Sequence, residues 1–150
     1  MEIEILNTDS ENKDFIELIK QLDEDLKVRY GELQKQYDKH NKVDYINDVV
    51  LIYKDKVPVA CGAFKKYNED IIEMKRIFVK SESRQQGLSK IIMNKLEESA
   101  KIKGYKYAIL ETGIRQFEAI NLYKSVGYEI IQNYEPYVEN ANSVCMKKAL

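Results

Sequence analysis

The chain has 150 residues, of which 44% are hydrophobic and 33% charged, and its formal net charge is -1. These values are typical of a globular protein that can bury a core, and we expect a single domain over residues 1–150. Acidic and basic residues are interspersed, which argues against a nucleic-acid-binding face driven by bulk charge. No apolar run approaches the length of a membrane span, and the first residues are acidic where a signal peptide would be basic. We therefore expect a cytoplasmic protein with neither a membrane nor a nucleic acid as partner.

The cysteine and histidine content limits the possible chemistry. Cys61 and Cys145 lie inside apolar, strand-like segments, which favours buried free thiols over a disulfide or a nucleophile. The single histidine, His40, lies in a polar run with no second His or Cys close in sequence. That spacing offers no metal-ligand pattern, so no metal is predicted.

A strand and two helices are expected at the start of the chain. Residues 2–7 alternate polar and apolar side chains, as an edge strand does. Asp9 or Ser10 can cap a helix over residues 11–25, whose apolar side chains recur at helical spacing. The polar run at residues 26–42 predicts a second, shorter helix.

Three consecutive strands should follow as an antiparallel meander. They are expected at residues 48–53, 57–67 and 71–80, with charged or polar turns between them. Gly62, inside the middle strand, indicates a bulge or a close approach of another element.

The third of these strands leads into the most informative stretch, residues 73–89. A β-branched segment passes through a polar turn into RQQGLS, where a helix begins. The first N–H groups of a helix have no partner within it, and the helix dipole adds positive potential there. Arg84 adds a planar, permanently charged group that suits phosphate oxygens. These features predict a phosphate-bearing ligand at the start of this helix.

The rest of the chain predicts a parallel crossover. Residues 87–103 carry an apolar stripe at helical spacing, and residues 105–112 read as a strand. In such a strand–helix–strand unit the two strands run parallel. The last expected elements are a helix at 116–126 and strands at 128–131 and 143–150.

Two motifs occur in order, separated by this helix and strand: RQQGLS at residues 84–89 and AINLYKSVGY at residues 119–128. Together they resemble the GNAT family of acyl-CoA-dependent N-acyltransferases. The first is similar to that family's pyrophosphate loop, although Ser89 stands where Gly or Ala is usual. The second is similar to a helix that ends in a Leu-Tyr pair and Gly-Phe/Tyr. The resemblance covers nearly the whole chain and implies an α/β (α+β) fold, with a mixed twisted sheet of six to seven strands and about four helices.

The resemblance also implies acetyl-CoA as co-substrate. Its pyrophosphate would lie against the loop, and its pantetheine arm would pair with the backbone of the preceding strand, which would also supply the N–H for the oxyanion. The residues implied to bind acetyl-CoA are Ile77, Phe78, Val79, Arg84, Gln85, Gln86, Gly87, Leu88, Ser89, Lys90, Asn121 and Tyr123.

Acyl transfer from a thioester to an amine requires a neutral amine, a stabilised oxyanion and a proton for the leaving thiolate. By resemblance, Glu73 is the general base, since it lies on the strand beside the acyl site. Glu111, near the end of the next strand, and water are the alternatives. Glu73 could instead face solvent or pair with Lys75, because alternation puts Glu73, Lys75 and Ile77 on one face of the strand.

Tyr123 matches the tyrosine that this family places near the CoA sulfur, where it protonates the leaving thiolate. The alternative is an aromatic core residue on the inner face of its helix. A buried tyrosine can fill a core with its ring and still present its hydroxyl, so we expect the catalytic role.

The acceptor is expected to be a primary amine of a small molecule. Tyr30, Tyr134 and Tyr137 lie in segments that the family uses for its variable acceptor pocket, as does Tyr37. Such rings, with the acidic residues Asp23, Glu24, Asp25 and Glu32 near the early ones, could hold a cationic amine, although ordinary packing and a solvated helix face are the other interpretation. Protein or peptide amines and a non-catalytic acyl-CoA-sensing module are the alternatives, because a fold does not determine an acceptor. Relatives often form homodimers through their C-terminal strands.

Overall fold

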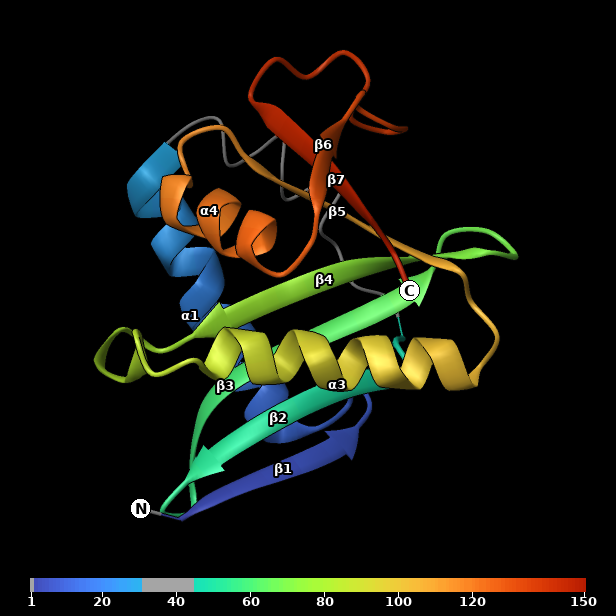
Figure 1. Ribbon diagram of the computed structural model, residues 1–150. Coiled ribbons are helices and arrows are strands. Elements are labelled where there is room, and N and C mark those ends of the chain that lie inside the picture. The colour runs from blue at the N-terminus through green and yellow to red at the C-terminus, as the bar shows by residue number, and fades with distance from the viewer. Residues whose placement is uncertain (1, 31–44) are drawn as a thin grey trace.

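The computed structural model describes residues 2–30 and 45–150. Within these residues, seven strands form one mixed sheet in the order β1-β2-β3-β4-β5-β7-β6 (Figure 1). The strands are β1 (Ile3–Thr8), β2 (Asp48–Lys54), β3 (Val57–Lys66), β4 (Ile71–Val79), β5 (Tyr107–Gly113), β6 (Glu129–Ile131) and β7 (Ser143–Ala149). The α-helices of the described part are α1 (Lys13–Tyr30), α3 (Leu88–Ile102) and α4 (Phe117–Ser125). The predicted mixed α/β architecture is confirmed, with three α-helices here where about four were expected.

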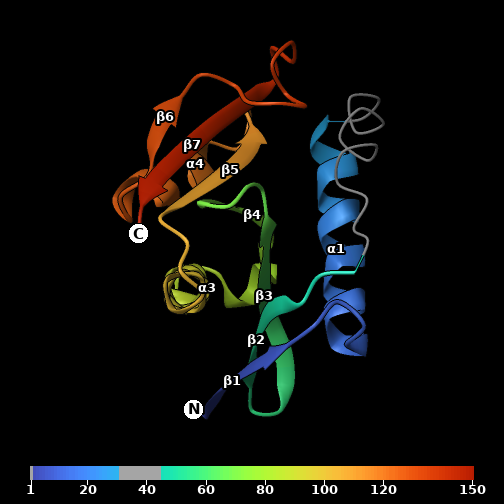
Figure 2. The ribbon, with the colours of Figure 1, turned by 90° about the vertical axis from the view of Figure 1, so that its right-hand side faces the viewer.

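The sheet lies between two helices that cover its opposite faces (Figures 1 and 2). On one face, α3 buries the apolar stripe predicted from its sequence, including Ile92, Met93 and Leu96. On the other face, α1 buries Phe15 and Leu18 against β2 and β3. Each fully buried side chain of this size stabilises the fold by about 1.5–3 kcal/mol, so these two interfaces hold the helices on the sheet.

The first helix differs from the prediction at both ends. Its N-cap is Asn12, whose side-chain oxygen accepts the N–H groups of Asp14 at 2.8 Å and Phe15 at 3.1 Å. Asp9 and Ser10 were the wrong candidates: the Ser10 hydroxyl instead accepts the N–H of Ile46 at 2.8 Å.

The predicted end of the first helix near residue 25 is also wrong, because α1 continues to Tyr30. Leu22 and Leu26 are four residues apart and extend the same apolar stripe, which explains the continuity. The rest of the predicted second helix, with Tyr37 and His40, lies outside the described residues.

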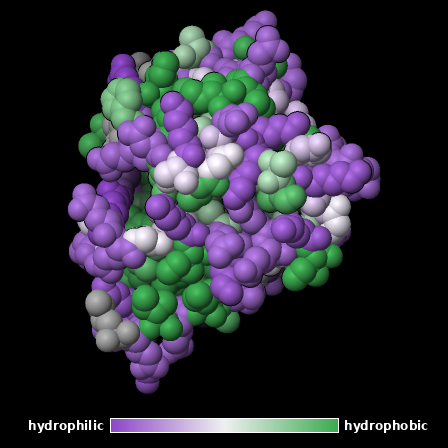
Figure 3. All heavy atoms as spheres, in the orientation of Figure 1, coloured by the Kyte–Doolittle hydropathy of each residue, from purple (hydrophilic) through white to green (hydrophobic). Residues whose placement is uncertain are grey.

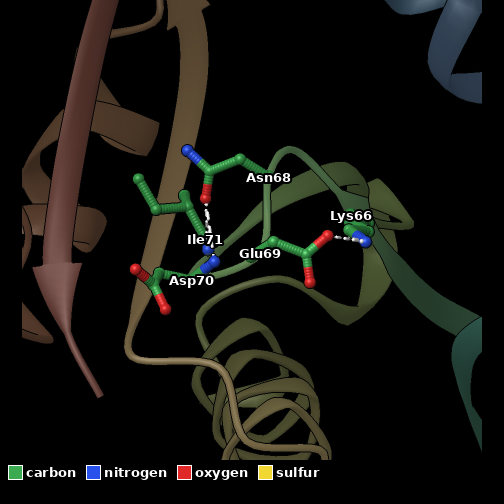
Figure 4. A network of polar contacts seen from close by, with 5 residues as sticks. All are labelled: Lys66, Asn68, Glu69, Asp70 and Ile71. Atoms are coloured by element: carbon green, nitrogen blue, oxygen red, sulfur yellow. Dashed lines mark hydrogen bonds and ion pairs between the residues drawn. The ribbon is translucent and has the colours of Figure 1, made fainter.

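The turn between β3 and β4 sets the register of the central strands (Figure 4). The Asn68 side-chain oxygen accepts the N–H groups of Asp70 and Ile71, both at 2.9 Å, and Lys66 forms an ion pair with Glu69. This is the local hydrogen bonding that favours asparagine in turns. The Asp70 carbonyl in turn accepts the N–H of Tyr107 at 3.1 Å, which ties the start of β4 to the start of β5.

A β-bulge interrupts β4 at its centre. One residue of β3, Gly62, faces two residues of β4, Arg76 and Ile77, and Arg76 has a left-handed φ of 59°. The predicted alternation is therefore wrong beyond Lys75. Ile77 packs with the core under α3, whereas Arg76 reaches Asp23 of α1 on the opposite face at 2.6 Å.

The bulge coincides with a separation of the sheet. β4 and β5 are parallel, as predicted, but their pairing covers only three positions and ends at Glu73 and Ile109. β5 pairs along its whole length with β7. The C-terminal half of β4 therefore leaves its neighbour, and the backbone from the bulge to Val79 has no strand partner on that side among the described residues.

The two cysteines are buried and free, as predicted. Burial raises the pKa of the Cys61 thiol to about 12 and that of Cys145 to about 11. Neither thiol has the character of a nucleophile at neutral pH.

The surface on the α3 side is mostly polar, with apolar side chains gathered over β1 and β2 (Figure 3). β1 is an edge strand, and Ile3 and Ile5 remain 45% and 41% exposed on it. None of the helices in residues 2–30 and 45–150 is both long and apolar enough to cross a membrane.

Replacing Gly62 tests the close approach at the bulge. A Cβ at this position would lie 2.4 Å from Cγ2 of Ile92 and 2.7 Å from Cδ1 of Ile77. We expect Gly62→Ala to lower the free energy of unfolding by about 1–3 kcal/mol, as overpacking of a core does. Chemical denaturation measures this change. Ile92→Ala removes the clashing atom, so its own cost should be smaller in the Gly62→Ala background than in the wild type; additive costs would contradict the proposed clash.

Candidate active site

Two adjoining cavities open where β4 leaves β5. The larger has a volume of ≈ 500 Å³ and runs from the end of β4 to the start of α3. The smaller, of ≈ 90 Å³, lies between β4, β5 and α1. Both are lined by Leu22, Leu26, Ile77, Gln116 and Tyr123.

The larger cavity gathers most of the residues predicted to bind acetyl-CoA. Those that line it are Ile77, Phe78, Val79, Arg84, Gln85, Gly87, Leu88, Ser89, Lys90 and Tyr123. Two of the predicted residues lie elsewhere. Gln86 accepts a hydrogen bond from the Lys54 ammonium at 2.7 Å, and Asn121 is exposed on α4.

The loop before α3 has the backbone geometry of an anion site. Gln85 and Gly87 adopt left-handed φ values of 63° and 76°, and Gly87 is the N-cap of α3. These turns bring the chain round so that α3 begins at the cavity. Its first N–H groups and the positive end of its dipole therefore face the cavity, where a phosphate would be stabilised.

The Arg84 side chain is held in place by three contacts. Its Nε donates to the carbonyl of Val79 at 2.9 Å, and its guanidinium lies 5.8 Å from the centre of the Phe78 ring. Its Nη2 donates to the Asp25 carboxylate of α1 at 3.0 Å. The arginine that would face a phosphate is thus already oriented at the rim of the cavity.

The smaller cavity is lined by buried charged groups. Glu73 is 4% exposed, and its side chain accepts a hydrogen bond from the Tyr134 hydroxyl at 2.6 Å. Its other oxygen lies 3.5 Å from the Lys75 ammonium. Lys75 also donates to the Tyr137 hydroxyl at 3.1 Å, and burial lowers the pKa of this ammonium. Glu73 therefore does not face solvent, and it does pair with Lys75.

Glu111 is the second carboxylate of the smaller cavity. Its Oε2 accepts a hydrogen bond from the Ser143 hydroxyl at 2.6 Å. Burial raises the pKa of Glu111 to about 7; the Ser143 hydrogen bond and the Lys75 charge oppose that shift. A glutamate with this pKa exchanges a proton near neutral pH, as a general base must.

Tyr123 lies at the junction of the two cavities. Its ring packs in the core with that of Tyr128, at 6.2 Å between centroids, and its side chain is 8% exposed. Burial, and then the charge of Glu111, raise the pKa of Tyr123. The raised pKa keeps the proton on the hydroxyl at neutral pH. This hydroxyl has no hydrogen-bond partner among the described residues, so it is free to contact a ligand.

Two of the tyrosines predicted to contact the acceptor lie behind the smaller cavity. Neither Tyr134 nor Tyr137 lines it; their hydroxyls contact Glu73 and Lys75. The loop that carries them is organised by Asn133, whose side-chain nitrogen donates to three backbone carbonyls, each at 3.2 Å. The third, Tyr30, is the last residue of α1, and its side chain is outside the described part.

Several contacts of the site were not expected from the sequence. Asp23 and Asp25, expected as acidic neighbours of the acceptor tyrosines, pair with Arg76 and Arg84. Ser143 donates to Glu111 from β7, the neighbour of β5 in the sheet but far from it in sequence. Nothing local in sequence indicates Ser143.

Comparison with known proteins identifies the family. A model of the acetyltransferase (GNAT) family matches residues 9–128, and this span contains both motifs. The chain belongs to this family. The GNAT resemblance expected from the two motifs is thereby confirmed.

Two curated relatives match parts of the chain. The uncharacterised N-acetyltransferase YsnE of Bacillus subtilis is 34% identical over 92 residues, which are 60% of this chain and 61% of YsnE. An uncharacterised N-acetyltransferase of Dictyostelium discoideum is 41% identical over 73 residues, 49% of this chain and 32% of its own. The chain therefore spans about a third to three fifths of the length of these relatives.

Solved GNAT structures share the whole fold. A protein from Klebsiella pneumoniae, assigned as an acyl-CoA N-acyltransferase, superposes with a TM-score of 0.82 and is 29% identical, with coverage of 99% of this chain and 97% of that one. A GNAT acetyltransferase from Elizabethkingia anophelis, solved with acetyl-CoA bound, gives a TM-score of 0.71 at 18% identity, covering 99% and 98%. The splayed sheet is thus the fold of this family. Among the described residues of the present chain, no cluster of His, Cys, Asp and Glu side chains could hold a metal ion.

The raised pKa of Glu111 predicts a pH dependence of stability. The folded chain binds this proton more tightly than an exposed glutamate of pKa 4.5 does, so the stabilisation is present at low pH and is lost as pH rises towards about 7. We expect Glu111→Gln to gain stability relative to the wild type over this window, by at most about 1.4 kcal/mol per pH unit. Denaturation at a series of pH values measures the difference. Glu129→Gln, on the exposed surface of β6, is the control and should show no such trend.

The Tyr134 hydroxyl supports a buried carboxylate, and its removal tests that contact. We expect Tyr134→Phe to lower the free energy of unfolding by about 1–3 kcal/mol, because Glu73 loses a donor that no water can easily replace. Tyr67→Phe is the matched control: Tyr67 is 40% exposed, and its ring packs edge-on against that of Tyr134. Equal stabilities of the two variants in urea would rule out this role for the hydroxyl.

Proposed function

We propose that this protein is an acetyl-CoA-dependent N-acetyltransferase that acts on a primary amine of a small molecule. The observation that carries the proposal is the position of Tyr123, which lines both the larger cavity, at the start of α3, and the smaller cavity, where Glu73 and Glu111 lie. A thioester bound in the larger cavity would present its carbonyl at Tyr123, where the two cavities meet.

The donor would bind along the larger cavity. Its pyrophosphate would lie on the first turn of α3 beside Arg84, and its pantetheine arm would run along the end of β4. The backbone from the bulge to Val79, released from β5, offers hydrogen bonds for that arm and an N–H for the oxyanion. The family relationship and the acetyl-CoA bound in the Elizabethkingia relative support this donor.

The reaction would be a direct attack in a ternary complex. The amine lone pair forms a bond to the thioester carbon, and the C–S bond then breaks as the thiolate leaves. Tyr123 gives its proton to that sulfur. Although burial raises the pKa of Tyr123, the same desolvation raises the proton affinity of a thiolate formed beside it, so the transfer remains feasible. Glu73, expected from the sequence as the base, and Glu111 are both candidates for the amine proton.

The size of the smaller cavity supports a small acceptor. At ≈ 90 Å³, with walls from α1, β4 and β5, it offers space for an amine and a short chain. The charged residues that line this cavity are Glu73, Lys75, Arg76 and Glu111. Together with Asp23, which pairs with Arg76 at 2.6 Å, they carry one net negative charge when all are ionised, which favours the approach of an ammonium. A cytoplasmic location and a homodimer remain predictions from the sequence.

A binding and turnover experiment tests the function. Isothermal titration with acetyl-CoA and a thiol-release assay with a panel of small primary amines should show binding and amine-dependent CoA release. Binding without release of CoA with any amine would favour a non-catalytic acyl-CoA module. Acetylation of peptide amines alone would identify a protein-modifying enzyme.

Two substitutions should separate binding from chemistry. Arg84→Ala removes the guanidinium from the larger cavity, and we expect the Kd for acetyl-CoA to rise about tenfold or more. Tyr123→Phe keeps the ring in the core and removes only the proton donor, so turnover should fall by about 10²–10⁴-fold with little change in the Kd. Calorimetry and steady-state kinetics give the two quantities. If Tyr123→Phe keeps its full turnover, the acid role is wrong.

A further inference from the structure

We propose that Glu111 takes the proton from the amine, and that Glu73 is a fixed neighbour rather than the base. This inference rests on the proposed function and names the residue that performs one of its steps. It starts from the hydrogen bonds of the two carboxylates, which differ.

Both oxygens of Glu73 are already engaged. Oε2 accepts the Tyr134 hydroxyl at 2.6 Å, and Oε1 lies 3.5 Å from the Lys75 ammonium. The residue is 4% exposed, so both contacts are shielded from solvent. They favour Glu73 as a fixed acceptor that orients Lys75.

Glu111 has one oxygen engaged and one available. Oε2 accepts the Ser143 hydroxyl at 2.6 Å, whereas Oε1 has no hydrogen-bond donor among the described residues. This oxygen is not fully buried, so it keeps access to the cavity that Glu111 lines. An amine in that cavity would meet this oxygen.

The charges around Glu111 come from three elements. Glu73 and Lys75 act on it from β4, Tyr123 lies near it on α4, and Cys145 faces it from β7. The negative charge of Glu73 makes Glu111 more basic, while Lys75 and the Ser143 hydroxyl make it less so. Together with burial, these effects leave a carboxylate that can accept a proton near neutral pH and release it again.

The proton transfers balance over one turnover. The ammonium gives one proton to Glu111, and the resulting amine forms the C–N bond as the C–S bond breaks. Tyr123 protonates the thiolate, and the second proton of the acylated nitrogen restores the tyrosine hydroxyl. Glu111 then releases the first proton to solvent, so the net products are the amide, CoA and one proton.

A matched pair of amines tests this assignment. Ethylamine is protonated at neutral pH, whereas trifluoroethylamine has nearly the same shape and is neutral there. With saturating acetyl-CoA, we expect Glu111→Gln to acetylate ethylamine about 10²–10⁴-fold more slowly than the wild type, while trifluoroethylamine loses far less, because it needs no base before attack. Equal losses with both amines would overturn the proposal. Glu129→Gln should behave as the wild type with both.

The pH profile of kcat/KM for ethylamine, measured with saturating acetyl-CoA, gives an independent test. The wild type should show an acidic limb near the pKa of Glu111, about 7, and this limb should disappear in Glu111→Gln. Ser143→Ala removes a hydrogen bond that lowers this pKa, so the limb should move to higher pH; Glu73→Gln removes a charge that raises it, so the limb should move to lower pH. Loss of the limb in Glu73→Gln, with its retention in Glu111→Gln, would return the base role to Glu73.

Calorimetric titration with acetyl-CoA should accompany each variant. Unchanged binding with lost turnover of ethylamine assigns the defect to proton transfer. A wild-type protein that fails to bind acetyl-CoA would contradict the proposed function, and this inference with it.

Discussion

The bulge opposite Gly62 is the constraint on which the site depends. Two residues of β4, Arg76 and Ile77, face one of β3 and the strand turns there, just beyond Glu73, where its pairing with β5 ends. The turn requires a glycine in β3, since Ile77 and Ile92 occupy the space where any side chain would lie. The same distortion sends Arg76 to α1 and Ile77 to the α3 side, and thereby opens the two cavities.

The charged groups that line the smaller cavity are stabilised by segments far away in sequence. An unpaired buried charge costs several kcal/mol, so the buried Glu73 and Lys75, and to a lesser degree the half-buried Glu111, need partners. Those partners come from the segment after β6 and from the first residue of β7, through Tyr134, Tyr137 and Ser143. The C-terminal segment thus stabilises the site. Its tyrosines act on the carboxylate and the ammonium rather than on the wall of the cavity.

Sequence patterns predicted those parts of the molecule that local chemistry determines. The apolar stripe of α3, its start at the loop that contains Gly87 and the parallel crossover follow from residue periodicity and the position of the glycine. Alternation failed at Arg76, because a period of two cannot register an inserted residue. The Ser143 contact to Glu111 joins residues 32 apart in sequence, and such pairs depend on strand register that only the folded chain provides.

Helix α1 lines both cavities, and this bears on the proposed ternary complex. Its Leu22 and Leu26 line both, while Asp23 holds Arg76 and Asp25 holds Arg84 at either end of the free part of β4. An anion that binds Arg84 must displace or share Asp25, which is half-exposed and only weakly attached. The larger cavity would therefore gain an arginine at a small electrostatic cost. In the proposed function α1 would be a common wall of the donor and acceptor sites, an arrangement that suits a reaction in which both substrates are bound together.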